Sequence, residues 1–270
     1  MKSSCISLIT DFGLCDEYVG VMKGVIAGIN PHAKVIDISH EVCPQNIIQA
    51  AHILCASYAY FPKNTVHLAV VDPGVGTDRR IIAIASKNHF FLAPDNGVLS
   101  LIINRFCRAV HVTRSDFFMP KVSTTFHARD IFAPVAAILS KNEDIKALGD
   151  EIPIQDLITI PNIDPISKNN QLVGTVIMAD RFGNLITNIS EKDLDIIDWR
   201  TSACIHVGNH TIFGISTHYM QVEKGESVAL MGSKGLLEIS VNCGNAKQML
   251  GVNIDDKIFV TQNKGLTKEP

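Results

Sequence analysis

The sequence predicts a two-domain protein, with an N-terminal three-layer α/β domain that has a largely parallel sheet and a smaller C-terminal all-β, barrel-like domain. In the first half, short β-branched runs alternate with longer helical patterns, which is typical of βαβ units. Prolines and polar residues without a sustained period crowd residues 149–170, as in a linker. Beyond them, short strand patterns separated by Gly and Asn turns favour a small antiparallel barrel. We therefore expect domains at residues 1–155 and 171–270, joined by a linker at 156–170.

The first five elements alternate between strand and helix. Apolar, β-branched runs predict strands at residues 5–10, 34–39 and 65–71, and helical periods predict helices at residues 16–30 and 44–61. Asp16 is placed to cap the first helix, and Pro44 lies at the entry to the second. The run at 65–71 is continuously apolar, as in a strand that is buried on both faces.

The rest of the chain contributes two more helices and many strands. In the first domain we predict strands at residues 81–86 and 90–94 and helices at residues 96–106 and 128–142. Pro134 lies inside the last helix, so we expect a kink or a restart there. In the second domain we predict seven strands, at residues 172–180, 184–190, 203–208, 210–215, 227–232, 236–241 and 257–261.

Composition and charge exclude several classes of protein. With 24 basic and 27 acidic residues the net charge is −3, which argues against nucleic acid and anionic membranes as partners. The seven cysteines are scattered and form no C-x-x-C pair for metal binding or redox exchange, which favours a reducing cytoplasm. The first apolar run ends at Asp11, unlike a secretory signal, and no run approaches the roughly 18 residues needed to cross a bilayer. We expect a soluble, cytoplasmic protein.

Common catalytic motifs are absent from the sequence. There is no G-x-x-x-x-G-K-[ST] phosphate loop, and GVGTDR at residues 74–79 lacks the third glycine of a dinucleotide fingerprint. Neither H-E-x-x-H nor G-x-S-x-G occurs, so neither a zincin nor a nucleophile elbow is indicated. Any catalysis must use another arrangement of residues.

Acidic residues follow several predicted strands of the first domain. Asp11, Asp72 and Asp95 each come at or just after a strand end, where ligands bind in open α/β sheets. A carboxylate there can accept hydrogen bonds from both hydroxyls of a ribose. The alternative is ordinary turn chemistry, because Asp before Gly or Pro is common in turns. We favour the turn for Asp95 and a functional role for Asp11 and Asp72.

The segment TTFHARD, residues 124–130, opens a predicted helix with His127 among charged neighbours. Free N–H groups and the positive end of the helix dipole make this a place to hold an anion or to keep a histidine neutral. The alternative is a surface helix start that Thr124 or Thr125 caps. The pattern alone leaves both interpretations of His127 open.

Six segments together carry a resemblance to a known family. In chain order they are residues 8–26, 70–79, 93–100, 125–137, 180–189 and 232–242. They are similar to segments of the S-adenosyl-L-methionine hydroxide adenosyltransferases, the hydrolase branch related to the fluorinases and chlorinases. The similarity runs from about Ile6 to Val260 and includes motifs of both domains. It implies hydrolysis of S-adenosyl-L-methionine to adenosine and L-methionine by attack of water at ribose C5′.

The resemblance assigns the catalytic residues of the first domain. The family's Asp, Arg and His that bind and orient the attacking water fall on Asp72, Arg79 and His127. The glycines between the first two would let the loop double back, so that carboxylate and guanidinium share a charge-assisted hydrogen bond. Arg80 is then expected to be solvated, although the opposite assignment of the two arginines stays open. Either Asp72 or His127 could accept the proton of water.

The resemblance also assigns substrate-binding residues. The ribose carboxylate matches Asp11, and Asp16 in the same turn either assists it or caps the helix. In the second domain, the resemblance implies that Asp180 contacts the methionine ammonium and that Ser233 contacts the methionine carboxylate. It places Phe182 and Asn184 in the adenine-binding segment, and Asn242 and Cys243 at the adenine rim. Lys234 replaces an arginine of the halogenases, which leaves open whether its side chain or only the backbone contacts substrate. Without the family, DRFGN at 180–184 would be a hairpin turn.

Assembly and alternatives complete the set of expectations. Family members are trimers, and the resemblance implies active sites between the first domain of one subunit and the second domain of its neighbour, with no metal or cofactor. Halogen-forming relatives carry other residues at the positions of Asp72 and His127, so water is favoured over halide as the nucleophile. Three alternatives stay open: a halide adenosyltransferase, a non-catalytic S-adenosylmethionine or adenosine sensor, and a phosphohydrolase whose strand-end acids hold a metal.

Overall fold

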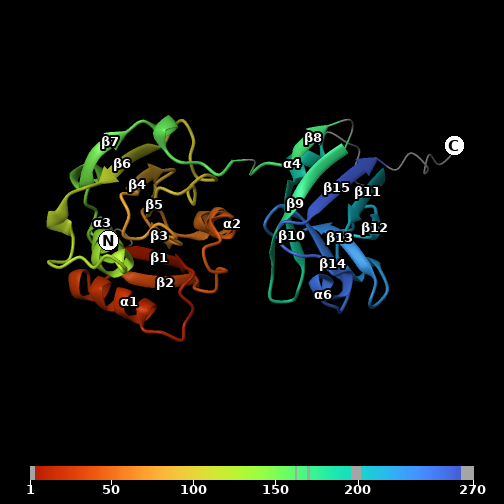
Figure 1. Ribbon diagram of the computed structural model, residues 1–270, viewed down its shortest axis with the longest axis horizontal. Helices are drawn as coiled ribbons and strands as arrows, with labels where there is room; N and C mark the ends of the chain where they lie inside the picture. Colours follow the sequence, from red (N-terminus) through yellow and green to blue (C-terminus); the bar gives the residue numbers. More distant parts are fainter. Residues whose placement is uncertain (1–3, 162, 169–170, 196–201, 263–270) are drawn as a thin grey trace. The chain divides into compact units, whose positions relative to one another are not determined.

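The computed structural model describes residues 4–161, 163–168, 171–195 and 202–262. The chain divides into two compact units, Met1–Pro161 and Asn162–Pro270 (Figure 1). The first unit is an α/β structure and the second is built on an antiparallel sheet, so the predicted fold class is confirmed. The first unit includes residues to Pro161, and in the second, β8 (Ile166–Lys168) already pairs with the following strand.

The first unit contains a mixed seven-stranded sheet in the order β2-β1-β3-β5-β4-β6-β7. The strands are β1 (Cys5–Thr10), β2 (Lys34–Ser39), β3 (Val66–Val70), β4 (Ile81–Ser86), β5 (His89–Pro94), β6 (Arg108–Val112) and β7 (Gly149–Ile152). Pairing is parallel from β2 to β5 and antiparallel from β5 to β7. The β-branched runs correctly predicted the first five strands, whereas β6 and β7 were missed.

Helices cover both faces of this sheet (Figure 1). Helices α1 (Tyr18–Ile29) and α3 (Ala133–Leu139) pack together on one face, and α2 (Ile47–Ser57) covers the other. Because side chains alternate along a strand, Leu68 of β3 belongs to the core cluster of α1 and α3, while Ala69 belongs to that of α2. The result is the predicted three-layer domain.

Helix boundaries differ from the predictions at three places. Helix α1 begins at Tyr18, its N-cap Glu17 makes no side-chain capping hydrogen bond, and Asp16 is exposed before it, so the predicted cap by Asp16 is wrong. Helix α2 begins at Ile47, because the Asn46 side chain accepts from a backbone N–H and caps it. The helix predicted at residues 128–142 begins as a π-helical turn, becomes α3 at Ala133, one residue before the predicted restart, and ends at Leu139.

The helix predicted at residues 96–106 is absent, and turns occupy this stretch. The Asn96 side chain accepts from the N–H of Val98, and the Asn104 side chain accepts from that of Phe106. Such local side-chain bonds compete with helical pairing. Gly97 also has a φ of +100° and faces Ile160 closely, a backbone conformation that no α-helix contains.

The second unit contains an eight-stranded antiparallel sheet with the main order β12-β11-β15-β9-β10-β14-β13, and β8 pairs with β9. The further strands are β9 (Gln171–Ala179), β10 (Leu185–Ser190), β11 (Ala203–Val207), β12 (His210–Phe213), β13 (Ser227–Met231), β14 (Leu236–Val241) and β15 (Lys257–Gln262). Each predicted strand of this domain is found. Edge strands β12 and β13 contact each other, so the sheet curls into a nearly closed barrel around residues such as Val176 and Leu237.

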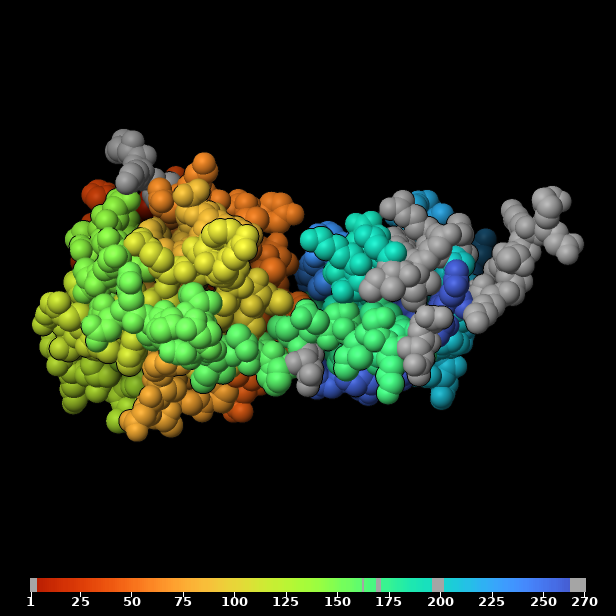
Figure 2. All heavy atoms as spheres, turned by 90° about the horizontal axis from the view of Figure 1, so that it is seen from above, coloured from red at the N-terminus to blue at the C-terminus, as the bar shows by residue number. Residues whose placement is uncertain are grey.

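Short helical segments connect the larger elements. Those in the described ranges include the α-helices α4 (Glu191–Leu194) and α6 (Ala246–Leu250) and the π-helical turn Ala128–Phe132. They also include 3-10 turns at Tyr58–Tyr60, Ser115–Phe117, Ile145–Leu148, Ile154–Asp156 and Tyr219–Gln221. In Figure 2, yellow and green segments, the colours of β6 and β7, make up much of the visible face of the first unit, and orange segments lie beside them. None of the helices in the described ranges is long and apolar enough to span a membrane.

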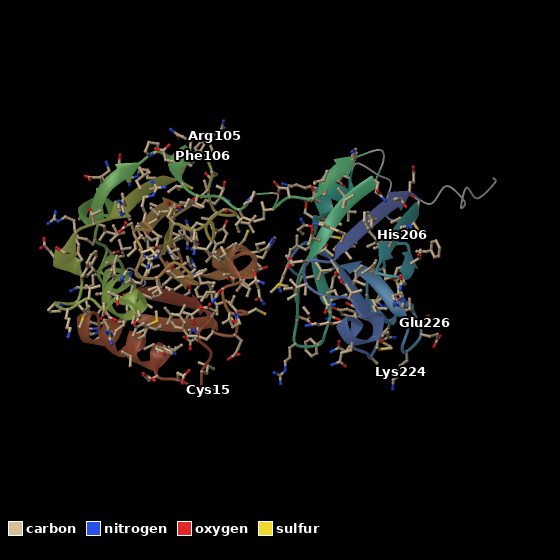
Figure 3. All side chains as sticks on the ribbon, in the orientation of Figure 1. Cys15, Arg105, Phe106, His206, Lys224 and Glu226 are labelled. Carbon is tan, nitrogen blue, oxygen red and sulfur yellow. The ribbon has the colours of Figure 1, made fainter. Side chains whose placement is uncertain are left out.

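Exposed side chains include reactive and aromatic groups. All seven cysteines lie in the described ranges and are free, and Cys15 projects from the loop between β1 and α1 (Figure 3). Phe106 is exposed, and the Arg105 guanidinium carbon lies 4.7 Å from the centroid of its ring. Figure 3 shows both side chains at the outer surface of the first unit.

Candidate active site

One loop, between β3 and β4, carries both Asp72 and Arg79. Backbone hydrogen bonds inside the loop fold it back on itself. Gly76 at its tip has a left-handed φ of +82° and packs on the backbone of Thr124, in the segment that leads to His127. Only glycine adopts such a conformation without strain. Because Gly76 has no side chain, the loop packs directly on the backbone of the segment that leads to His127.

The structure brings Asp72, Arg79 and His127 together, as the resemblance implied. Arg79 Nε donates to Asp72 Oδ1 at 2.9 Å and to Oδ2 at 2.7 Å. Arg79 Nη2 lies 3.0 Å from His127 Nδ1. The Asp72 side chain is 5% exposed and that of Arg79 is 10% exposed. This nearly dry setting strengthens the charge-assisted contacts between them.

The contact with Arg79 determines which ring nitrogen of His127 carries the proton. A guanidinium has only donors, so Nδ1 of His127 accepts, and the proton of the neutral ring resides on Nε2. Burial, and then the Arg79 charge, lower the pKa of His127 below its usual value. The imidazole is therefore neutral at physiological pH and presents an N–H donor.

A cavity of about 400 Å³ adjoins this cluster. Asp11, Asp72 and His127 line it, and β1 and β3, which precede the two acids, are neighbouring parallel strands. Asp11 Oδ2 accepts from the backbone N–H of Gln45 at 2.8 Å, which orients the carboxylate. The shared edge expected for Asp11 and Asp72 is observed.

Three aromatic rings form another wall of this cavity. Tyr18 packs edge-on against Phe126 with 5.0 Å between ring centroids, and Phe12 lies 5.7 Å from Tyr18 and 6.2 Å from Phe126. Sequence reasoning missed all three rings, although each lies within two residues of a predicted acid or histidine. An apolar wall beside polar groups is typical of sites for small organic ligands.

Three other charged residues from the sequence analysis, Asp16, Arg80 and Asp95, do not line this cavity. Asp16 is exposed and does not line it. Arg80 Nε donates to Asp95 Oδ2 at 2.8 Å, and Asp95 Oδ1 accepts from the backbone N–H of Ile158 at 2.9 Å. The expectation of a solvated Arg80 is therefore wrong, because the β4–β5 pairing places it opposite a buried carboxylate. Asp95 therefore has a structural role, although its side-chain partners are Arg80 and Ile158 and not the turn residues that follow it.

A second cavity, of about 270 Å³, lies within the second unit. Five predicted substrate-binding residues line it: Asp180, Phe182, Asn184, Ser233 and Lys234. The other two predicted residues are not among its lining. Asn242 Nδ2 donates to the carbonyl of Val222 at 2.8 Å, and Cys243 is exposed with a φ of +57°.

Asp180 closes the turn between β9 and β10. Its Oδ1 accepts from the backbone N–H groups of Phe182 and Asn184, both at 2.9 Å, and its Oδ2 accepts from Asn184 Nδ2 at 2.9 Å. The hairpin turn that the sequence alone indicated is present. The same residues line the cavity, so the two interpretations of DRFGN are compatible.

Sequence reasoning missed a buried polar cluster in this cavity. Tyr219 donates its hydroxyl to Glu238 Oε1 at 2.8 Å, and Ser240 donates to the same oxygen at 2.9 Å. Burial, and then the contact with Glu238, raise the pKa of Tyr219 to about 12. Lys234 Nζ lies 3.3 Å from Met178 Sδ. The sequence signal that could have identified Glu238 is a charged residue within the mainly apolar strand at residues 236–241.

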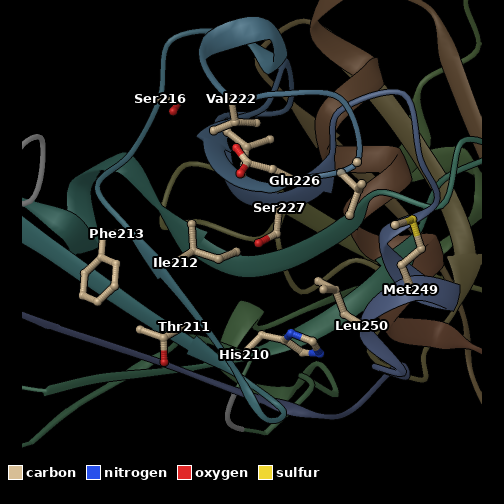
Figure 4. Close-up of a pocket in the computed structure, with 13 residues that line it drawn as sticks. His210, Thr211, Ile212, Phe213, Ser216, Val222, Glu226, Ser227, Met249 and Leu250 are labelled. Carbon is tan, nitrogen blue, oxygen red and sulfur yellow. The ribbon is translucent and has the colours of Figure 1, made fainter.

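A third cavity, of about 560 Å³, lies where edge strands β12 and β13 meet (Figure 4). His210 and Phe213 come from β12, and Glu226 and Ser227 lie at the start of β13. None of the predicted site residues lines it. Across the described ranges, no group of three or more His, Cys, Asp or Glu side chains is arranged to hold a metal ion.

Comparison with known proteins decides the family. Residues 6–149 match the model of the SAM hydroxide adenosyltransferase N-terminal domain, and residues 174–259 match that of the C-terminal domain. The chain belongs to this SAM hydroxide adenosyltransferase family. Within it, the chain is 36% identical over 261 residues to the (R)-S-adenosyl-L-methionine hydrolase of Salinispora tropica, covering 95% of this chain and 97% of that protein.

Two further comparisons place this adenosyltransferase among its relatives. It is 24% identical to a fluorinase of Nocardia brasiliensis, over 89% of this chain and 91% of the fluorinase. The crystal structure of an uncharacterized conserved protein from Thermotoga maritima matches with a TM-score of 0.88 at 38% identity, covering 95% of this chain and 100% of that one. The resemblance read from the sequence is confirmed, and the similarity to the hydrolase exceeds that to the fluorinase.

Proposed function

We propose that the protein is an enzyme that hydrolyses (R)-S-adenosyl-L-methionine to adenosine and L-methionine. The observation that carries the proposal is the contact of Arg79 with both Asp72 and His127 at the wall of a cavity. The name of the Salinispora tropica relative supports the substrate. Since the L descriptor already defines the methionine α-carbon, the (R) descriptor refers to the sulfonium centre.

The reaction requires the protein to activate the attacking water but not the leaving group. A sulfonium departs from C5′ as a neutral thioether, because the electron pair of the breaking C–S bond neutralises the sulfur, and no general acid is required. Water held in line with that bond gains from positioning, which supplies about 7 to 11 kcal/mol in well-oriented systems. The site therefore has to orient one water molecule and accept one proton.

The hydrogen bonds around Arg79 favour Asp72 as the proton acceptor. His127 has no free lone pair, since Nδ1 accepts from Arg79 and Nε2 carries the proton. Its Nε2–H donates to the water oxygen, and one water hydrogen points to Asp72. The remaining lone pair attacks C5′, the O–C bond forms as the C–S bond breaks, and the proton passes to Asp72. Arg79 stabilises the developing hydroxide.

Substrate recognition is divided between the units. In the first, Asp11 accepts from the ribose hydroxyls, with Asp16 as a further candidate. In the second, we retain the predicted set for adenine and methionine: Asp180, Phe182, Asn184, Ser233, Lys234, Asn242 and Cys243. The lining of one cavity by five of them supports the set.

We propose a homotrimer whose active sites each combine the first domain of one subunit with the second domain of its neighbour. The division of the predicted residues between two units supports this arrangement. The reaction as written uses neither a metal nor another cofactor. We also propose residues 1–155 and 171–270 as the two domains. We further propose that the protein is located in the cytoplasm.

Isotope labelling tests the reaction. Purified protein is incubated with the separated sulfonium epimers in water enriched in oxygen-18, and the adenosine is analysed by mass spectrometry. We expect label in the 5′-hydroxyl and faster turnover of the (R) epimer. Parallel reactions with chloride or fluoride test the halide alternative, for which 5′-haloadenosine would be the product. Turnover that stops on addition of a chelator would instead support the metal-dependent alternative.

A further inference from the structure

We propose that His40 is a positioning residue, which fixes the turn that carries Asp11 and so aligns this carboxylate with the ribose hydroxyls. The inference rests on the proposed function and deepens it, because it adds a residue that no motif singled out. His40 does not line the cavity of Asp11. It acts through Thr10, which ends β1 immediately before Asp11.

An irregularity in β2 brings His40 to this position. The register of β2 against β1 shifts by one residue between Asp37 and Ser39, so β2 contains an extra residue, as in a β-bulge. In a regular strand, side chains three positions apart point to opposite faces. The shift instead brings Asp37 and His40 to the same face, and it places His40 beside Thr10 at the strand end.

Both nitrogens of the His40 ring face polar partners. Nδ1 lies 2.8 Å from Thr10 Oγ1, and Nε2 lies 3.1 Å from Asp37 Oδ1. The second contact lacks the alignment of a hydrogen bond, but the carboxylate, itself paired with Lys23 of α1, favours the proton on Nε2. In the neutral ring, Nδ1 therefore accepts from the Thr10 hydroxyl. Thr10 is fully buried and His40 is 3% exposed, so water does not compete for this bond.

The backbone on each side of Asp11 is tied to His40. Thr10 Oγ1, whose hydrogen points to the ring, accepts from the N–H of Phe12 at 3.3 Å. The His40 carbonyl accepts from the N–H of Gly13 at 2.8 Å. The ring and the main chain of His40 thus hold the turn from Thr10 to Gly13 at two points.

The loop that follows His40 holds the Asp11 carboxylate itself. Asp11 Oδ2 accepts from the backbone N–H of Gln45. Gln45 has a φ of +65°, a left-handed conformation that a residue with a side chain adopts only at a cost. Such strain persists where surrounding contacts maintain it. Because His40 contacts Thr10, it anchors the start of this loop to the strand end that carries Asp11.

A second histidine–hydroxyl pair on β1 provides a structural counterpart. Ser7 Oγ lies 2.7 Å from His67 Nδ1, and both residues are fully buried. Ser7 and Thr10 are three positions apart on β1, so their side chains point to opposite faces of the sheet. Neither Ser7 nor His67 lines the cavity of Asp11. The pair has the same chemistry on the same strand, and it is the matched control for His40.

Calorimetry with two nucleosides measures the alignment of Asp11. Adenosine is compared with 2′,3′-dideoxyadenosine, which lacks both ribose hydroxyls, on the full-length protein. The wild type should prefer adenosine by about tenfold or more, the effect of hydrogen bonds to a charged group. Thr10→Val keeps the shape of the side chain but removes its hydroxyl. It should lower the preference by about fivefold, the effect of one neutral hydrogen bond, with unchanged affinity for dideoxyadenosine. Thr10→Ser keeps the hydroxyl and should keep the preference.

A second pair of variants tests the ring, so the test stands if one variant does not fold. His40→Phe removes both nitrogens and should lower the preference as Thr10→Val does. His40→Asn places an amide oxygen near the position of Nδ1 and should restore most of it. His67→Phe should lose stability in thermal unfolding but keep the preference for adenosine.

Steady-state kinetics separates positioning from chemistry. In Thr10→Val and His40→Phe, the KM for S-adenosylmethionine should rise by about fivefold, while kcat changes by less than about twofold. The reason is that Asp72, Arg79 and His127 keep their contacts. A general loss of folded protein would lower the active concentration and would not raise KM.

Three results would overturn the inference. The first is an unchanged adenosine preference in folded Thr10→Val and His40→Phe. The second is an equal loss of the preference in His67→Phe. The third is a wild type with no preference for adenosine, although oxygen-18 in its product would still support the hydrolase. Conversely, absence of wild-type turnover would remove the proposed reaction, yet the nucleoside preference of the variants would still decide the role of His40.

Discussion

A Cβ placed on Gly76 would lie 2.3 Å from the carbonyl oxygen of Thr124. This contact docks the loop of Asp72 and Arg79 on the segment that precedes His127. The first prediction follows from it. Gly76→Ala should strain a φ of +82° and push the loop away, so that kcat/KM falls by about a hundredfold, since small displacements of reacting groups are costly.

Gly74 provides the control in the same loop. Its nearest neighbour to an added Cβ is Thr77 Oγ1 at 3.5 Å, an ordinary contact. Gly74→Ala should therefore remain close to wild type in steady-state kinetics. Equal losses in both variants would show that the loop is merely sensitive to any added side chain.

The second prediction concerns the proton acceptor. Asp72→Asn keeps the size of the side chain but removes its basicity, so kcat should fall by about 10² to 10⁴, the range for general-base groups. Adenosine affinity, measured by calorimetry, should stay within a few-fold. Asp78→Asn changes an exposed acid of the same loop and should leave kcat unaltered. Full activity in Asp72→Asn would show that another group is the general base.

The third prediction concerns the dependence of activity on pH. The pKa of His127 is lowered by burial and by Arg79, and the neutral ring is the form that accepts from Arg79. The neutral form persists above the folded pKa, so kcat/KM should remain level as pH falls through 6.5 and decline only in more acidic solution. An NMR titration of the His127 ring tests whether the acidic decline in kcat/KM arises from this histidine. A decline centred at or above pH 6.5 would contradict the proposed neutral ring.

The fourth prediction concerns stability in acid. His67 is fully buried, bonded to Ser7 at 2.7 Å and to His89 at 3.1 Å, and burial followed by the His89 charge lowers its pKa to about 3. Between pH 6.5 and about 3 the unfolded chain binds a proton that the folded protein does not. The free energy of unfolding should therefore drop by about 1.4 kcal/mol per pH unit as pH falls through this window.

Urea unfolding at several pH values measures that slope. His67→Phe should be less stable at neutral pH, because the Ser7 hydroxyl loses its partner, but should show a shallower slope in acid. His32→Gln removes an exposed histidine and should keep the wild-type slope. An unchanged slope in His67→Phe would assign acid sensitivity to other groups.

The fifth prediction tests the proposed division of the active site between subunits. Asp72→Ala and Asp180→Ala should each be inactive alone. Mixed and reassembled, they should regain part of the wild-type activity, because some sites of a hybrid trimer carry neither substitution. Subunit exchange is verified by native mass spectrometry of labelled chains. Exchange without recovered activity would argue against a shared site.

Local pattern alone determined much of the fold. The runs at residues 5–10, 34–39 and 81–86 coincide with β1, β2 and β4, because β-branched residues between turn signals favour strands wherever they occur. The strands of the second unit from β9 to β15 were found for the same reason, whereas β8 (Ile166–Lys168), inside the predicted linker, was missed. The resemblance to a family, rather than residue spacing, supplied the roles of Asp72, Arg79 and His127, and geometry supports their proximity.

Other features depended on residues distant in the chain. Residues 96–106 carry a helical pattern, yet side-chain bonds from Asn96 and Asn104 and the close approach of Ile160 to Gly97 hold turns there. The partner of Arg80 is Asp95, which the antiparallel pairing of β4 with β5 places opposite it. Neither the pairing nor the close approach is encoded in any short window of sequence.

The sequence by itself determined the class of each domain, most strands and, through its motifs, the family. Only the tertiary structure decided which nitrogen of His127 faces Arg79, which acid engages Arg80, and which hydroxyl His40 contacts. The physical reason is that strand formation follows from local side-chain periodicity, whereas the state of a titratable group depends on donors and acceptors brought to it from other strands and loops.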